Sequence, residues 1–205
     1  MDKPAATFAW CAVVAIGLSG VLVAAEQEPA ALASITLVVT NLAGVSPAIL
    51  DRAEVEAGRA YRRLGVRTNW IDAAHASAAP TTSSGFTIAL VIQSRLAGVS
   101  VGGSRSVMAA APRSWSERGG SIYVFYDHVT DVANVHRADT ALLMGIVIAH
   151  EMGHLLLHHS EHAGEGLMRG VWDADAIKQG AVGLLWFSPS ESHQIRKTLS
   201  TCCPP

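Results

Sequence analysis

The chain has 205 residues, of which 50% are hydrophobic and 16% are charged, and its formal net charge is −2. This length suffices for one hydrophobic core of ordinary size, and the chain is too short for two full domains. Because the net charge is slightly negative, the sequence lacks the basic footprint of a nucleic-acid-binding protein, and no nucleic-acid partner is expected.

The N-terminus has the layout of a secretory signal peptide. Lys3 precedes an apolar run over residues 8–23, and the small residues Ala24 and Ala25 follow it. A basic start, an apolar core and small residues at the end are typical of a cleaved leader. We therefore expect a secreted or periplasmic protein that is cleaved after Ala25. The alternative is a membrane anchor formed by residues 8–25, because the run nearly reaches spanning length.

The three cysteines predict no disulfide framework. Cys11 lies inside the signal peptide, and Cys202 and Cys203 are adjacent at the C-terminus. Two thiols near a chain end are also poor candidates for zinc ligands, because terminal residues are seldom held firmly.

The chain between the N-terminal segment and the C-terminus is predicted to form a single domain over residues 34–200. A linker over residues 26–33 precedes this domain, and a tail over residues 201–205 follows it. Runs rich in β-branched and aromatic residues predict five strands, the fourth of them weak. These strands are Ser34–Leu42, Val66–Ile71, Phe86–Gln93, Ser106–Ala111 and Ser121–Tyr126.

Two helices are predicted from their capping residues, one after the first strand and one near the C-terminus. Ser46 and Pro47 supply a cap and a first helical residue, and Gly65 supplies a stop. Ser188 and Glu191 frame a capping box that starts the last helix. The sequence thus predicts an α+β fold with a mixed, twisted sheet of about five strands, an N-terminal helix and a C-terminal helix.

A third predicted helix runs from Ala141 to Leu157, with Asp139 or Thr140 as its cap. It is apolar on nearly every side, so we expect it to be buried through the middle of the domain. A membrane span is the competing interpretation, and the polar residues within the run argue against it.

The second half of this helix contains the motif His150-Glu151-Met152-Gly153-His154. On a helix, His150 and His154 share a face, so both imidazoles can bind one metal ion. Glu151 then lies beside the ion, where a carboxylate can take a proton from a bound water. A catalytic zinc usually has three protein ligands, so the motif predicts a further ligand elsewhere.

His162 is the favoured third ligand. It follows the predicted end of the helix, where a glycine-rich turn can fold the chain back toward the ion. His158 lies one further turn along the helix, too far for one ion to span. Glu191 is the main rival, although its place in the capping box already explains it. The remaining candidates are His158, His159, Glu161 and Glu165.

The segment from His150 to Met168 resembles the metzincin clan of zinc peptidases, whose signature is HExxHxxGxxH followed by a methionine turn. It is more narrowly similar to a group of short, secreted bacterial proteins that read approximately HExGHLLLGxxxHxxxGIMR. In the clan signature Leu157 occupies the glycine position and Ser160 the third-histidine position, so His162 comes two residues later. The resemblance implies a minimal metzincin domain in which Met168 forms a floor beneath the zinc. It also implies an extended peptide substrate that adds to the sheet edge at Ser106–Ala111.

The sequence therefore predicts a secreted peptidase in which zinc is bound by His150, His154 and His162 and Glu151 is the general base. One alternative is a zinc-binding module of the same fold without turnover. A second is a different metallohydrolase, including a peptidase with Glu191 as third ligand. Peptide deformylases are excluded because their cysteine-bearing partner motif is absent, and intramembrane peptidases because they need several further spans.

Overall fold

A computed structural model describes residues 33–76, 85–94, 107–112, 118–159 and 161–202. The predicted signal peptide, nearly all of the linker, and Cys203 lie outside these residues. Within them one helix follows the first strand, four strands come next, and four helices follow the last strand of a five-stranded sheet, which confirms the predicted α+β fold.

The sheet has the order β2-β1-β3-β5-β4. The first four strands in this order are parallel, and β4 pairs with β5 antiparallel, so the sheet is mixed as predicted. The strands are β1 (Ala33–Asn41), β2 (Val66–Asp72), β3 (Phe86–Gln93), β4 (Ala109–Ala110) and β5 (Gly119–Phe125). Four agree closely with the prediction, and β4 is shorter than the predicted Ser106–Ala111, of which Ser106 is not described.

The start of β5 corrects one prediction. The strand was predicted to begin at Ser121, but Gly119 and Gly120 also belong to it and pair with β3. Gly119 has φ +154 and approaches the backbone of Thr87 so closely that a Cβ would overlap the Thr87 carbonyl. The glycines mark a close approach of two backbones, which a sequence pattern does not separate from a turn.

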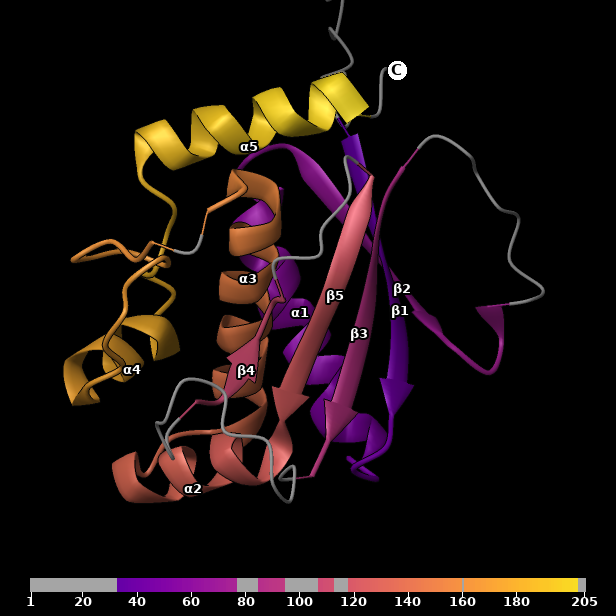
Figure 1. Ribbon diagram of the computed structural model, residues 1–205. Coiled ribbons are helices and arrows are strands. Elements are labelled where there is room, and N and C mark those ends of the chain that lie inside the picture. The colour runs from indigo at the N-terminus through magenta and orange to yellow at the C-terminus, as the bar shows by residue number, and fades with distance from the viewer. Residues whose placement is uncertain (1–32, 77–84, 95–106, 113–117, 160, 203–205) are drawn as a thin grey trace, which may run out of the picture.

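The helices are α1 (Pro47–Arg62), α2 (Tyr126–His136), α3 (Thr140–Leu157), α4 (Ala174–Ala181) and α5 (Pro189–Cys202). Figure 1 shows α1 and α3 side by side against one face of the sheet, with α5 crossing one end of α3 and α2 near the other. α2 and α4 were not among the predicted helices. The last helix continues to Cys202, two residues into the segment expected to be a tail.

α3 is the central element of the core. Asp139 caps its start by accepting a hydrogen bond from the Leu142 N–H, with 3.0 Å between the atoms. Its contact with α1 is close, because a Cβ on Gly145 would lie 2.5 Å from the Ala53 carbonyl oxygen. The buried hydroxyl of Tyr61 donates to the Ala149 carbonyl at 3.0 Å. The residues next to the HExxH motif are thereby fixed against α1.

α3 is long and apolar enough to cross a membrane by length and composition, with a mean hydropathy of 1.6. Of this stretch, 89% is buried inside the domain, as in the core helix of a globular fold. The burial agrees with the prediction that the motif occupies a rigid, enclosed helix.

Candidate metal centre

Two of the predicted ligands project from the C-terminal half of α3. His150 is 4% exposed and His154 is 8% exposed. They are one helical turn apart and therefore lie on one face. The helix stops directly afterwards, because His158 adopts the left-handed conformation with φ 57. The helix therefore ends sharply although His158 stands where the similar bacterial proteins have glycine.

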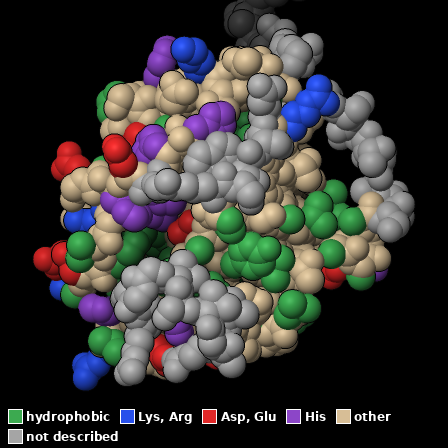
Figure 2. All heavy atoms as spheres, in the orientation of Figure 1, with side chains coloured by type: hydrophobic (Ala, Val, Ile, Leu, Met, Phe, Trp, Pro, Cys, Tyr) green, Lys and Arg blue, Asp and Glu red, His purple; other side chains and the backbone are tan. Residues whose placement is uncertain are grey.

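The third predicted ligand, His162, comes from the turn that follows α3. The Ala163 N–H donates to the Met168 carbonyl at 2.8 Å, which closes the turn. The Leu167 N–H donates to the Trp186 carbonyl, also at 2.8 Å, and ties the turn to the segment before α5. Figure 2 shows histidine side chains gathered on this face of the molecule.

The three imidazoles converge through their Nε2 atoms. The Nε2 of His154 lies 3.0 Å from that of His150 and 3.3 Å from that of His162. These histidines form a group whose potential ligand atoms all lie within 4.8 Å of one another. The structure thus brings together the three residues predicted to be ligands, in an arrangement able to hold a metal ion.

The other nitrogen of each helical histidine is already engaged. The Nδ1 of His150 lies 2.8 Å from the Leu167 carbonyl oxygen, and the Nδ1 of His154 lies 2.9 Å from the His159 carbonyl oxygen. A carbonyl only accepts, so each Nδ1 carries the proton and donates it. Backbone carbonyls hold metal-binding histidines in this tautomer in many proteins.

Burial keeps both helical imidazoles neutral. Burial lowers the pKa of His150 to about 3, and it also lowers the pKa of His154. With Nδ1 protonated and the ring neutral, each Nε2 presents a lone pair and no proton. Two such lone pairs 3.0 Å apart repel each other unless a cation lies between them.

Two of the separations between these atoms are compatible with a tetrahedral metal ion such as zinc. In tetrahedral coordination with Zn–N bonds of about 2.05 Å, two ligand nitrogens are roughly 3.3 Å apart. The separations of 3.0 and 3.3 Å from His154 Nε2 are close to this value, and all the potential ligand atoms lie within 4.8 Å of one another. Three imidazoles also match the donor set of a catalytic zinc, which leaves one position for water or substrate.

Glu151 is a buried carboxyl group beside this cluster, and it is 8% exposed. Burial raises its pKa to about 7, and a hydrogen bond from the backbone N–H of Ala111 acts in the opposite direction. Ala111 directly follows β4, so Glu151 is held against the edge of the sheet. A carboxyl with a pKa near neutrality can both take and return a proton.

Met168 packs beneath the site, as the resemblance implied. It is fully buried, and a Cβ on Gly153 would overlap its Sδ atom and lie 3.0 Å from Phe187 Cε1. The glycine between the two helical ligands therefore makes room for the methionine. Phe187 in turn packs on Tyr61, with 5.3 Å between the ring centroids.

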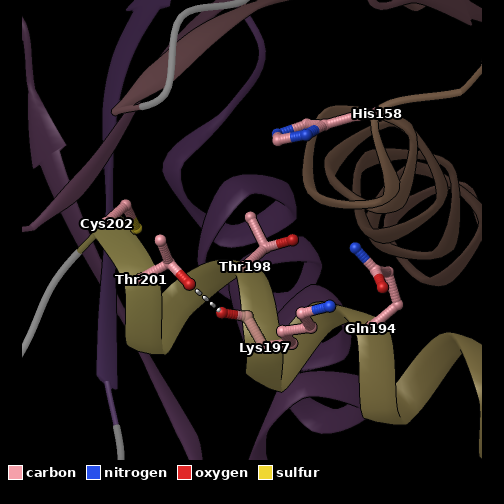
Figure 3. Close-up of a pocket in the computed structure, with 6 residues that line it drawn as sticks. All are labelled: His158, Gln194, Lys197, Thr198, Thr201 and Cys202. Carbon is pink, nitrogen blue, oxygen red and sulfur yellow. Dashed lines mark hydrogen bonds between the residues drawn. The ribbon is translucent and has the colours of Figure 1, made fainter.

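The rival ligands lie elsewhere. His158 faces a hollow of about 260 Å³ between the end of α3 and α5, together with Thr198 and Cys202 (Figure 3). His159 contributes its carbonyl to His154. The carboxylate of Glu191 accepts from the Ser188 N–H at 2.7 Å, so it serves the capping box. Among the described residues, the metal-binding group contains none of the rivals, and Glu161 and Glu165 are likewise outside it.

Two functional contacts were not foreseen from the sequence. Trp172 stands edge-on to His150, with 5.6 Å between the ring centroids. Gly170 lies against His162, where a Cβ would be 3.0 Å from the His162 Cβ. Both residues come shortly after Met168, and this closeness in the sequence is the one indication that they lie near the site. Their contacts depend on how the turn closes, which the sequence does not display.

No family model matches this chain, and no curated protein matches it either. The resemblance to metzincins therefore consists of the motif, the methionine and the order of the elements.

Proposed function

We propose that this protein is a secreted zinc-dependent peptidase that hydrolyses peptide bonds with Glu151 as general base. The convergence of three imidazole Nε2 atoms beside a buried carboxyl group supports the proposal most strongly. A purely structural zinc site has four protein ligands and no need of a base, whereas this cluster has three ligands and a base.

His150, His154 and His162 would hold the zinc. Bound zinc would supply a water molecule of lowered pKa and would polarise the substrate carbonyl. The carbonyls of Leu167 and His159 keep two of the three rings in the metal-binding tautomer. Trp172 limits the rotation of the His150 ring by standing against it.

Glu151 would take the proton of the attacking water and return it to the leaving amine. Burial raises the pKa of Glu151 to about 7 in the metal-free protein, and a bound zinc ion would lower it, so the carboxylate would be ionised and able to accept the proton. The N–H of Ala111 orients the carboxyl group, so the base is placed by the sheet as well as by α3.

The substrate would be an extended peptide that pairs with β4. In the described part of the sheet β4 is an edge strand, and β5 is its single neighbour. A peptide added to this edge would run past Ala111, and therefore past Glu151. Backbone pairing of this kind recognises peptides with little regard to sequence.

Replacement of Glu151 by Gln tests the proposal against a zinc-binding module without turnover. We expect the variant to retain one zinc per chain and to lose hydrolysis of a denatured protein substrate by at least a hundredfold, because the proton acceptor is gone. Glu165→Gln, at an exposed position outside the metal group, is the matched control and should keep full activity. Persistent hydrolysis in Glu151→Gln would show that the base is misassigned, and absence of hydrolysis in the wild type would favour the binding module.

The third ligand is tested by zinc content. His162→Ala should lose most of its zinc at equilibrium with a competing chelator, whereas Glu191→Ala should keep it and lose only a helix cap. Zinc loss confined to Glu191→Ala would overturn the ligand assignment.

Secretion is tested by N-terminal sequencing of protein from the expressing cells. A mature chain that begins at Glu26 is expected, and an intact N-terminus in the membrane fraction would instead indicate an anchor over residues 8–25.

A further inference from the structure

A second hollow lies on a different part of the molecule, between the C-terminal end of α1 and the first turns of α5. Its volume is about 250 Å³. α1 contributes Ala60, and the residues after it contribute Arg63 and Leu64. α5 contributes Pro189, Ser192 and Arg196, and the floor is Trp186 and Phe187. The helical residues are spaced by three or four positions, so each helix turns one face toward the hollow.

The charge of this hollow is positive. Arg63 and Arg196 line it, and no lining residue is acidic. Within the described chain, no ion pair involves either arginine. Two arginines, one directly after α1 and one on α5, therefore line one small hollow that has no acidic residue in its lining.

Arg63 is held in place by an aromatic ring. Its Cζ lies 3.8 Å from the centroid of the Trp186 ring, so the guanidinium stacks on the indole. A stacked guanidinium keeps the N–H groups along its edge free for a bidentate contact. Because the side chain is already ordered, less conformational entropy is lost when an anion binds.

We propose that this hollow binds a small oxyanion, either phosphate or the carboxylate of a small molecule, between Arg63 and Arg196. The Ser192 hydroxyl adds a neutral donor that suits either group. The volume of about 250 Å³ is below the roughly 300–1,000 Å³ of typical drug-sized sites, so the ligand is small. The site is independent of the proposed peptidase activity.

The experiment is calorimetric titration of the zinc-loaded protein with inorganic phosphate and, separately, with acetate, at constant ionic strength. Saturable binding of one anion per chain is expected, and the tighter of the two identifies the preferred group. Arg63→Gln and Arg196→Gln should each weaken that binding about fivefold, because each removes one partly solvated charge contact.

Lys197→Gln is the matched control, since Lys197 lies on the same helix but faces the other hollow (Figure 3). It removes the same charge and should leave binding unchanged. Equal zinc content and equal melting temperature across the three variants exclude a loss of fold. Binding that both arginine variants retain in full would place the anion elsewhere, for example on the bound zinc, and would overturn the proposal. Absence of saturable binding of both anions would overturn it as well.

Discussion

Gly153 connects the metal-binding helix to the methionine beneath it, and its replacement by Ala gives a quantitative test. The new Cβ would overlap Met168 Sδ and lie 3.0 Å from Phe187 Cε1. Met168 is fully buried and Phe187 is 8% exposed, so neither side chain can move out into solvent. Overpacking of this kind typically costs about 1–3 kcal/mol, whereas Gly→Ala inside a helix gains about 1 kcal/mol. Because the new Cβ would overlap Met168 Sδ outright, the cost should lie in the upper part of this range, about 2–3 kcal/mol, so we expect a net destabilisation of about 1–2 kcal/mol.

The assay is thermal unfolding of the metal-free protein, followed by urea denaturation. For a domain of this size, a loss of about 1–2 kcal/mol lowers the melting temperature by roughly 3–6 °C. The same change in a Met168→Ala background separates the clash from other effects. There the main obstacle is gone, so Gly153→Ala should be neutral or stabilising by up to about 1 kcal/mol. An equal loss in both backgrounds would refute the idea that Gly153 is kept small for the methionine.

Three further predictions concern the pH dependence of stability, the third ligand and a helix end. In the metal-free protein, burial raises the pKa of Glu151 from 4.5 to about 7. The neutral Glu151 carboxyl group makes its full contribution to the free energy of unfolding below pH 4.5. This contribution is lost as the pH rises through 7. In urea titrations, the stability of Glu151→Gln relative to the wild type should therefore rise by about 3 kcal/mol as the pH increases from 4.5 to 8. A difference that stays constant with pH would contradict this. Gly170→Ala should weaken zinc binding about tenfold in chelator competition, because its Cβ would lie 3.0 Å from the His162 Cβ. Gly164→Ala is its control, since a Cβ there meets nothing within 4 Å, and equal affinities would show that Gly170 does not position the ligand. Arg137→Gly should raise the melting temperature by about 2 °C, because Arg137 ends α2 with φ 52, which costs a non-glycine residue about 1 kcal/mol. A lower melting temperature would mean that the arginine side chain contributes more than the strain costs.

The parts of the fold that depend on short-range patterns were predictable. The four long strands have β-branched runs, and Asp139 and Ser188 cap α3 and α5. α1 starts after Ser46 as predicted, although the side chain of this serine makes no capping hydrogen bond. The face shared by His150 and His154 follows from helical geometry alone. These features depend on neighbours within one turn or one strand, which the sequence displays directly.

The two missed helices differ in what the sequence offered. α2 starts after Phe125 without a side-chain cap, and Val129 and Ala133 are its buried residues, so its apolar pattern is weak. α4 does carry a signal, because Asp173 accepts a hydrogen bond from the Ala176 N–H at 2.8 Å. Asp173 is therefore a helix-start signal that the sequence displays, and α4 could have been predicted from it.

The contacts that complete the metal centre were beyond sequence patterns, because they join segments far apart in the chain. The Leu167 carbonyl accepts from His150, and the Leu167 N–H donates to Trp186. Nothing in the local sequence marks a leucine peptide group as a hydrogen-bonding partner of a ligand. The hydrogen bond from Ala111 to Glu151 has the same character, since it depends on where β4 meets α3.

The Leu167 peptide group also explains how His162, two residues beyond the third-histidine position of the metzincin signature, still lies beside His150 and His154. Its carbonyl is fixed to the His150 ring and its N–H to the Trp186 carbonyl, so this point of the turn is set by α3 and by the segment before α5. The hydrogen bond between Ala163 and Met168 then places His162 relative to that point. The position of the ligand is therefore determined by how the turn closes on Leu167 and Met168, and the number of residues after His154 can change while the turn absorbs the difference. Convergence of Nε2 atoms on one point is accordingly a stronger criterion for this centre than the spacing of histidines along the chain.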